Sequence, residues 1–215
     1  MKIFLVLIVL VVAALAGPLV AQTLSAIPQL ALDNDVARVL RVTLPPRATF
    51  PVDATTDVVA VRLQDETATF IPKGTHAVRS NSSDHEVVDL LIEPKQHWDA
   101  PVRPCSAPMN CTRTTKMGND PIAWTTTLFT NGFLTAATHR VVPGGTLDSF
   151  YYSAKGSDAI VVVPFTEISA NFGGIDETLK AGQPYFSTAT EAEVTGTNAE
   201  GRWFVLRINS PNAKK

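Results

Sequence analysis

Histidine is the residue type that decides whether this chain carries a metal site or a general base. The chain has four histidines, at positions 76, 85, 97 and 139. The segment His85-Glu-Val-Val-Asp89 approaches the helical zinc-protease pattern, but Asp stands where a second His is needed. The segment also continues into Leu90-Leu-Ile92, an apolar run typical of a strand. These residues therefore do not predict a zinc protease.

The short motifs of several other enzyme classes are missing from the sequence. It has no Gly-x-Ser-x-Gly nucleophile elbow, no Gly-rich phosphate loop and no dinucleotide-binding fingerprint. Gly173-Gly174 stands between strand-like segments and predicts a turn. His139 lies inside a strand-like segment, so we expect a surface or packing role for it.

Cys105 and Cys111 are the two cysteines of the chain. A close pair in an exported chain predicts a local disulfide. Closing so small a loop would stabilise the fold by about 2 kcal/mol on the chain-entropy model. A zinc site would need two further ligands, and the nearest histidine, His97, offers one. The pair therefore predicts a bond that holds a loop.

The first 21 residues have the pattern of a secretory signal peptide. One basic residue, Lys2, precedes an apolar run that ends near Gly17-Pro18, and Ala21 offers a small residue for cleavage. The alternative is an uncleaved anchor, but the run is short for a bilayer span. We therefore expect an exported protein, periplasmic or extracellular, with no stable membrane anchor after cleavage.

The charge of the chain is weak and mixed. The formal net charge is -2, and removing residues 1–21 takes away only Lys2, which gives -3. Adjacent basic residues at the C-terminus, Lys214-Lys215, suit a solvated tail. This distribution predicts no nucleic-acid partner.

Beyond residue 35 the pattern is one of short strands and turns. Apolar or alternating segments are bounded by Pro, Gly, Asp or Asn, which is typical of an all-β sandwich or barrel. Short helices are expected at most near 23–33 and in the middle of the chain. The strand-like segments are 36–44, 58–63, 67–71, 87–92, 123–129, 133–142, 159–163 and 203–208.

The chain contains two similar halves. The segment ending at Pro45-Pro46 resembles the one ending at Pro143-Gly144, with an offset of 98 between Pro45 and Pro143. The segments around Ile92 and Ile208 also match, with an offset of 116. The offset grows by 18, so we expect the first half to lack a hairpin near Asp65-Glu66.

The middle of the chain separates the two copies. It is rich in Pro, Ser, Thr and Asn, holds both cysteines and lacks periodicity, so it predicts a linker. The expected organisation is a signal peptide over 1–21, a first domain over 22–104, a linker over 105–121 and a second domain over 122–215.

The order and spacing of these segments resemble the cupin superfamily, in particular exported bacterial proteins with two cupin domains. Val141–Thr146 resembles the opening of the family's first motif, and Ile71–Asn81 resembles its second motif. Lys180–Phe186 resembles the turn before the second motif in the other half. The resemblance covers 35–95 and 122–209. It implies an all-β fold of two cupin-like jelly-roll barrels, the first truncated.

An ordinary cupin would hold a metal with three His and one Glu, and this chain departs from that pattern. The His-x-His position falls on Asp53-Ala-Thr55 or Val52-Asp-Ala54 in the first half, and on Tyr151-Tyr-Ser153 or Phe150-Tyr-Tyr152 in the second. His76 alone stands near a ligand position, one residue early by the commonest spacing. We therefore expect no metal and no other cofactor. The first-half ligand pocket is predicted to contain Asp53, Thr55 and His76.

The interior of the second barrel offers a second candidate pocket. In one register Tyr151 and Ser153 point inward, and Glu193 lies near the position of the lost second-motif histidine. Tyr185 or Phe186 would add an aromatic wall, together with Trp203 or Phe204; Tyr185 and Trp203 are the residues predicted for the pocket. Such side chains either fill the barrel or line a site for a small molecule such as a sugar.

The resemblance to cupins, together with the missing histidines at the family's metal-ligand positions, favours an exported, non-catalytic two-cupin protein. Such a protein would bind a small molecule or serve as a structural module. The alternative is a cupin enzyme: a metal-dependent oxygenase or isomerase with an atypical ligand set, or a metal-free isomerase or epimerase using Tyr151, Glu193 and His76. A missing hairpin leaves a sheet edge to be covered, either by the other half or by a second copy in a homodimer.

Overall fold

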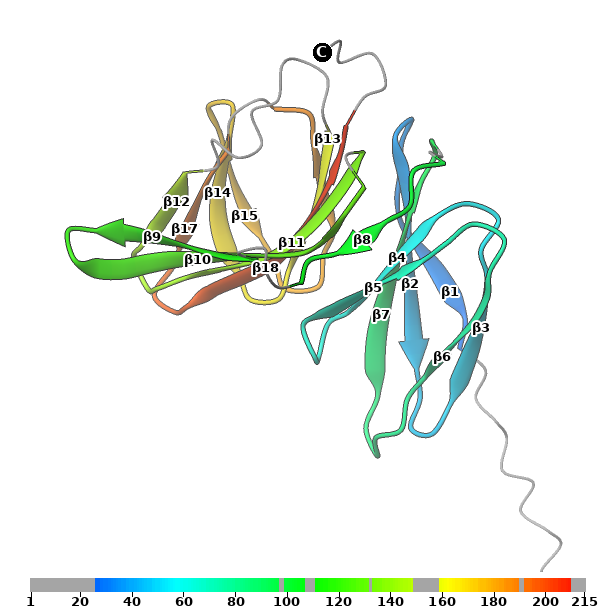
Figure 1. Cartoon of the computed structure of the whole chain (residues 1–215). Coiled ribbons are helices and arrows are strands. Elements are labelled where there is room, and N and C mark those ends of the chain that lie inside the picture. The colour runs from blue at the N-terminus through cyan, green and yellow to red at the C-terminus, as the bar shows by residue number, and fades with distance from the viewer. Residues whose placement is uncertain are drawn as a thin grey trace, which may run out of the picture.

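The computed structural model describes residues 26–96, 99–106, 111–131, 133–148, 159–189 and 192–209. Within these ranges the chain forms strands and turns and no helix, which confirms the expected all-β class. Figure 1 shows two groups of strands side by side, a first half with β1–β7 and a second half with β8–β18. The described ranges contain no helix that is long and apolar enough to cross a membrane.

The first half consists of a five-stranded sheet and a two-stranded sheet. The larger sheet has the order β1-β2-β7-β4-β5, and β3 pairs with β6 in the smaller one. All pairs are antiparallel. The strands are β1 (Pro28–Asp33), β2 (Ala37–Leu44), β3 (Thr49–Asp53), β4 (Val58–Arg62), β5 (Thr67–Ile71), β6 (His76–Ser80) and β7 (Val87–Pro94).

The second half has a larger pair of sheets. The order β16-β13-β18-β11-β10-β8 forms one sheet, in which β9 also pairs with β10, and β12-β17-β14-β15 forms the other. The strands are β8 (Arg103–Pro104), β9 (Thr112–Met117), β10 (Asp120–Thr130), β11 (Leu134–Val141), β12 (Thr146–Asp148), β13 (Ala159–Pro164), β14 (Ile168–Phe172), β15 (Ile175–Leu179), β16 (Tyr185–Ser187), β17 (Ala192–Gly196) and β18 (Gly201–Ile208).

Two expected segments differ in the structure. A strand, β1, occupies much of the stretch where a short helix was expected, because it pairs with β2 along its length. The expected linker over 105–121 contains β9, which pairs with β10 through the two-residue turn Gly118-Asn119. Gly118 has a φ of 64°, which suits glycine at a tight hairpin turn.

Besides β8 and β9, the second half has a hairpin inside its barrel that the first half lacks. In the second half, β13 is followed by the hairpin β14–β15 before the chain reaches β16. In the first half, β4 leads through the turn 63–66 directly into β5. The smaller sheet therefore has four strands in the second half and two in the first.

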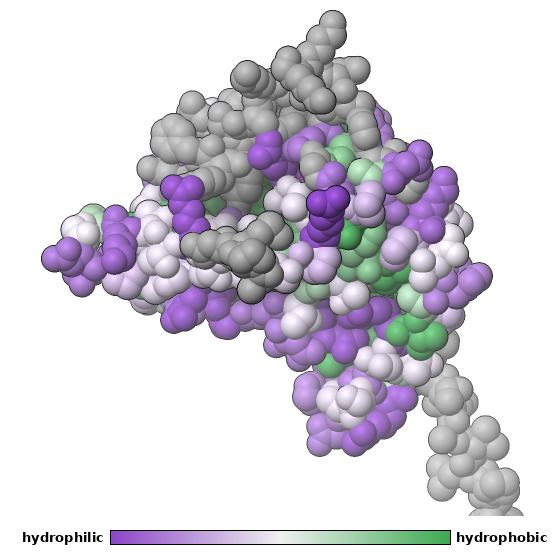
Figure 2. Space-filling model, viewed as in Figure 1, coloured by the Kyte–Doolittle hydropathy of each residue, from purple (hydrophilic) through white to green (hydrophobic). Residues whose placement is uncertain are grey.

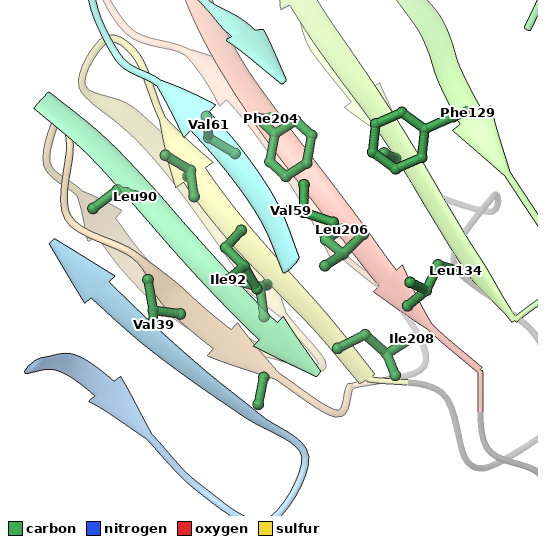
Figure 3. Close-up of a cluster of buried hydrophobic side chains, with 14 of the residues drawn as sticks. Val39, Val59, Val61, Leu90, Ile92, Phe129, Leu134, Phe204, Leu206 and Ile208 are labelled. Atoms are coloured by element: carbon green, nitrogen blue, oxygen red, sulfur yellow. The ribbon is translucent and has the colours of Figure 1, made fainter. Parts of the chain in front are cut away.

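One hydrophobic core joins the two halves. Alternate residues of β4, β7, β13 and β18 contribute to it, such as Val59, Ile92, Val161 and Phe204, and Figure 3 shows these strands facing each other across the cluster. β7 has apolar side chains on both faces, because its other face lies inside the first half. This shared core holds the larger sheets of the two halves together.

Each half also has an inner core of its own. In the second half, β14, β15 and β17 pack over β13 and β18, with Ile168, Phe172 and Trp203 among the buried residues. In the first half, Val52 of β3 packs with Val58 and Leu91 of the larger sheet. In Figure 2 the coloured part of the visible face is mostly hydrophilic or intermediate, and the larger hydrophobic areas are on the side of the first half.

Candidate functional site

The predicted first-half residues lie on the outer surface. Asp53 and His76 are cross-strand neighbours on β3 and β6, with 2.6 Å between His76 Nδ1 and Asp53 Oδ1. Their side chains are 71% and 87% exposed, and Thr55 is also exposed. The inward positions of these strands are held by Val52 and Ala77, which pack in or against the inner core. The structure thus brings Asp53 and His76 together, but outside the barrel.

The inner face of the first half carries an ionic cluster instead. Asp89 of β7 is fully buried and accepts two hydrogen bonds from Arg62, from Nε at 2.8 Å and from Nη2 at 3.0 Å. Arg79 of β6 donates to the same carboxylate from Nε at 2.7 Å. Both arginine side chains are 15% exposed. Two guanidinium groups therefore share one buried carboxylate.

This pairing fixes the protonation state of Asp89. Burial by itself raises the pKa of the Asp89 carboxyl, but the hydrogen bonds and charges of Arg62 and Arg79 outweigh it and lower the pKa below its ordinary value. The hydrogen bond to Asp89 raises the pKa of Arg62 in turn. The cluster is charged at neutral pH and has one more positive than negative group.

In the second half the corresponding interior is aromatic. Trp203 of β18 is 1% exposed and His139 of β11 is 5% exposed. The two side chains are cross-strand neighbours, and their rings stack with 5.2 Å between centroids. His139 Nδ1 lies 3.0 Å from the Thr125 hydroxyl on β10. His139 therefore lies inside the barrel, in the packing role that was one of the two expected from the sequence.

Burial controls the charge of His139. Removal from water lowers the pKa of the imidazole from 6.5 to about 3, so the ring is neutral at physiological pH. A neutral imidazole flat against an indole is a packing arrangement. Trp203 belongs to the inner core of the second half, so its place in the structure is that of a core residue.

The other predicted second-half residues are distributed differently. Tyr185 of β16 packs against the same inner core and stacks on Phe172, with 4.8 Å between ring centroids. Burial, followed by the charge of Glu177, raises the pKa of Tyr185. Glu193 is exposed, because its neighbours on β17 occupy the inward positions. Tyr151 and Ser153 lie outside the described residues.

A cleft of about 330 Å³ lies on the face of the second half's larger sheet that continues from the shared core. Its floor has a row of three threonines in register across three strands, Thr112 on β9, Thr126 on β10 and Thr138 on β11. Phe165 forms part of the wall, and the β4–β5 turn contributes Glu66 from the first half. The cleft is thus built by both halves.

The charged groups of the cleft are paired. Arg140 lies over the Trp124 ring at 5.0 Å from the centroid and forms a 2.5 Å ion pair with Glu200. Arg202, the cross-strand neighbour of Arg140, forms a 2.5 Å ion pair with Glu66. Two cations and two anions therefore balance each other around an aromatic and hydroxyl-bearing floor.

Two further expectations concern cysteines and metal ligands. The disulfide between Cys105 and Cys111 is present, which confirms the predicted pairing, and it lies beside β8 and β9. Among the described residues, no group of three or more His, Cys, Asp or Glu side chains is placed to hold a metal ion. His85 lies on the surface, with its Nδ1 3.2 Å from Oδ1 of the adjacent Asp84.

Comparison with known proteins identifies the fold. No protein-family model and no curated protein sequence matches this chain. Among solved structures, AerE from Microcystis aeruginosa is similar over 88% of this chain and 100% of its own, with a TM-score of 0.56 and 7% identity. Procruciferin, an 11S globulin from Brassica napus, is similar over 90% of this chain and 87% of its own, with a TM-score of 0.55 and 8% identity.

A cupin 2 conserved barrel domain protein from Leptotrichia buccalis also aligns, over 92% of this chain and 94% of its own, with a TM-score of 0.49 and 8% identity. The strand order and the likeness to AerE and procruciferin show that the chain has the cupin-like jelly-roll fold. Identities of 7 and 8% establish the fold alone, because one fold hosts many functions. The function of this cupin-fold chain must therefore be argued from its own residues.

Proposed function

We propose that this protein is an exported, non-catalytic module with two cupin domains, the first truncated, and that it binds a small neutral molecule. The observation that carries the proposal is the cleft floored by Trp124 and three threonines. Its volume of about 330 Å³ lies within the range of small-molecule sites. The signal-peptide pattern of residues 1–21 and the disulfide support export.

The composition of the cleft favours a neutral, hydroxyl-bearing ligand such as a sugar. The ion pairs of Arg140 with Glu200 and of Arg202 with Glu66 leave no net charge to attract an ion. Threonine hydroxyls both donate and accept hydrogen bonds, which matches the hydroxyls of a sugar. Trp124 and Phe165 offer apolar surface to the carbon skeleton.

The interior of the second barrel is a weaker candidate for the ligand. Trp203 and His139 are almost completely buried, and Trp203 belongs to a core cluster. Tyr185 is more accessible and would contribute if the barrel mouth held a ligand. The cleft is preferred because its aromatic and hydroxyl groups stand at an accessible surface.

The test is a thermal-shift screen of the secreted form with neutral mono- and disaccharides as probes. A ligand that binds the folded state alone raises the unfolding free energy by about 2.7 kcal/mol at 100 times its Kd. We expect a saturable rise in Tm with at least one probe, and Trp124→Ala should abolish it. Met117→Ala is the matched control, because Met117 is 73% exposed and lies outside the cleft lining.

Two results would overturn this proposal. One is a probe response that survives in Trp124→Ala. The other is near-stoichiometric transition metal in protein purified without chelators, lost in His76→Ala, which would favour the enzyme alternative. The metal content of the parent protein and of His76→Ala is therefore measured alongside the screen.

A further inference from the structure

The Arg62–Asp89–Arg79 cluster uses few of its hydrogen-bond donors. Each guanidinium carries five N–H donors. Arg62 spends Nε and one Nη2 donor on Asp89, and Arg79 spends Nε. Within the described part of the chain, Asp89 is the hydrogen-bond partner of both arginines. The remaining donors, including the terminal nitrogens of Arg79, are available to a further acceptor.

The cluster also lies at an uncovered part of the barrel. Thr67 and Thr69 of β5 are cross-strand neighbours of Arg62 and Ala60, so their side chains lie on the inner face of the sheet, yet both are exposed. In the second half the hairpin β14–β15 packs over β13 and closes the equivalent face. The first half has only the turn 63–66 at this point. Its inner face is open beside Arg62.

Charge at this opening favours an anion. Two guanidinium groups face one buried carboxylate, which leaves one positive charge in a partly desolvated position. Asp65, in the exposed turn after β4, is the remaining acidic group that acts on Arg62, and its effect on the Arg62 pKa is the smallest of the contributions. Asp65 is exposed to solvent, so water screens its charge.

We propose that the open side of this cluster is a binding site for a small oxyanion, a carboxylate or a phosphate, held between Arg62 and Arg79. The planar guanidinium fork matches two oxygens of either group. The hydroxyls of Thr67 and Thr69 lie on the same face to receive the rest of the ligand. This site is separate from the Trp124 cleft and stands without it.

The test measures Tm against concentration for three probes: sodium acetate, inorganic phosphate and sodium chloride, at matched ionic strength. At about ten times Kd, a bound oxyanion should raise Tm by roughly 3–6 °C above chloride. A response to acetate alone indicates a carboxylate ligand, a response to phosphate alone indicates a phosphate ligand, and a response to both indicates that the site accepts either. No excess over chloride for either oxyanion overturns the proposal.

Variants assign the response to the cluster. Arg79→Gln removes an ion pair to Asp89 and so lowers the Tm in the absence of anion. The parent and the variant are therefore compared by their anion-dependent increase in Tm, not by the absolute Tm. We expect the anion-dependent increase in Tm to vanish in Arg79→Gln. Arg79→Lys keeps the charge but lacks the planar guanidinium fork, so the apparent affinity for the oxyanion should fall at least tenfold. Arg103→Gln, an exposed charge on β8, is the matched control and should respond as the parent does.

Two outcomes would contradict the assignment. An increase retained in Arg79→Gln would place the anion elsewhere, and an equal loss in Arg103→Gln would indicate general charge screening. Trp124→Ala should leave the anion response unchanged. Failure of the sugar screen and failure of the anion titration can therefore be distinguished.

Discussion

The two halves place different chemistry at the same point of one scaffold. β2 and β11 have eight residues each, as do β7 and β18. Matching these strands residue by residue gives offsets of 97 and 114, in place of the 98 and 116 inferred from the sequence, and sets Val42 against His139 and Asp89 against Trp203. The first half therefore has a buried carboxylate between two arginines where the second has a stacked imidazole and indole.

The hairpin that distinguishes the halves explains this difference. Where β14–β15 covers the inner face, apolar and aromatic side chains are sealed from water and stabilise the fold by burial. Where the turn 63–66 replaces the hairpin, Thr67 and Thr69 are exposed and the two arginine side chains keep 15% of their surface accessible, while Asp89 stays buried between them. An open barrel tolerates an ionic cluster that a closed one would exclude.

Removing the buried carboxylate should have the largest effect. Asp89→Ala leaves Arg62 and Arg79 facing each other without a counter-charge, and breaking a buried ion pair costs about 3–5 kcal/mol. We expect the free energy of unfolding to fall by that amount in urea titrations. The triple variant Asp89→Ala, Arg62→Met, Arg79→Leu should recover most of the loss. A loss below about 1 kcal/mol for Asp89→Ala would mean that the cluster is solvated.

The second half should respond to pH through the buried His139. Burial lowers the pKa of His139 to about 3 in the folded protein, while the unfolded chain has the ordinary value of 6.5. Between these values the unfolded state binds a proton that the folded state does not. The stability present above pH 6.5 therefore falls as pH decreases, by up to about 1.4 kcal/mol per unit.

Urea unfolding at intervals between pH 7 and 4.5 measures this slope. His139→Phe keeps an aromatic ring against Trp203 and should flatten the curve. Asp89, whose folded pKa is lowered, keeps its contribution above the ordinary carboxyl pKa and loses it only as pH falls further, so Asp89 adds no slope in this window. An unchanged slope in His139→Phe would show that other groups cause the pH dependence.

The fold was predictable because its signals are local. Short alternating segments bounded by turn residues predicted strands at 58–63 and 87–92, and the structure has β4 and β7 there. The close cysteine pair predicted the disulfide. The β9–β10 hairpin was missed although Gly118-Asn119 is a turn signal, because a polar, Thr-rich strand on a sheet surface lacks apolar alternation.

The site was less predictable because it depends on which face of a strand is inside. A shift of one residue exchanges the two faces. His76 is exposed on β6, and its neighbour Ala77 takes the inward position. The sequence shows Asp89 within an apolar run, but only the register reveals that Arg62 and Arg79 reach it. The Trp124 cleft likewise depends on cross-strand register and on a turn from the other half.

The smallest effect is expected at the surface pair of the first half. Asp53 and His76 lie 2.6 Å apart, but both side chains are mostly exposed, and exposed ion pairs contribute about 0.2–1 kcal/mol. His76→Ala should therefore change the free energy of unfolding by less than about 1 kcal/mol. Urea titration at pH 7 measures this change. A larger loss would mean that this pair supports the fold as the buried groups do. The contrast between the outer and inner faces of the same barrel would then fail.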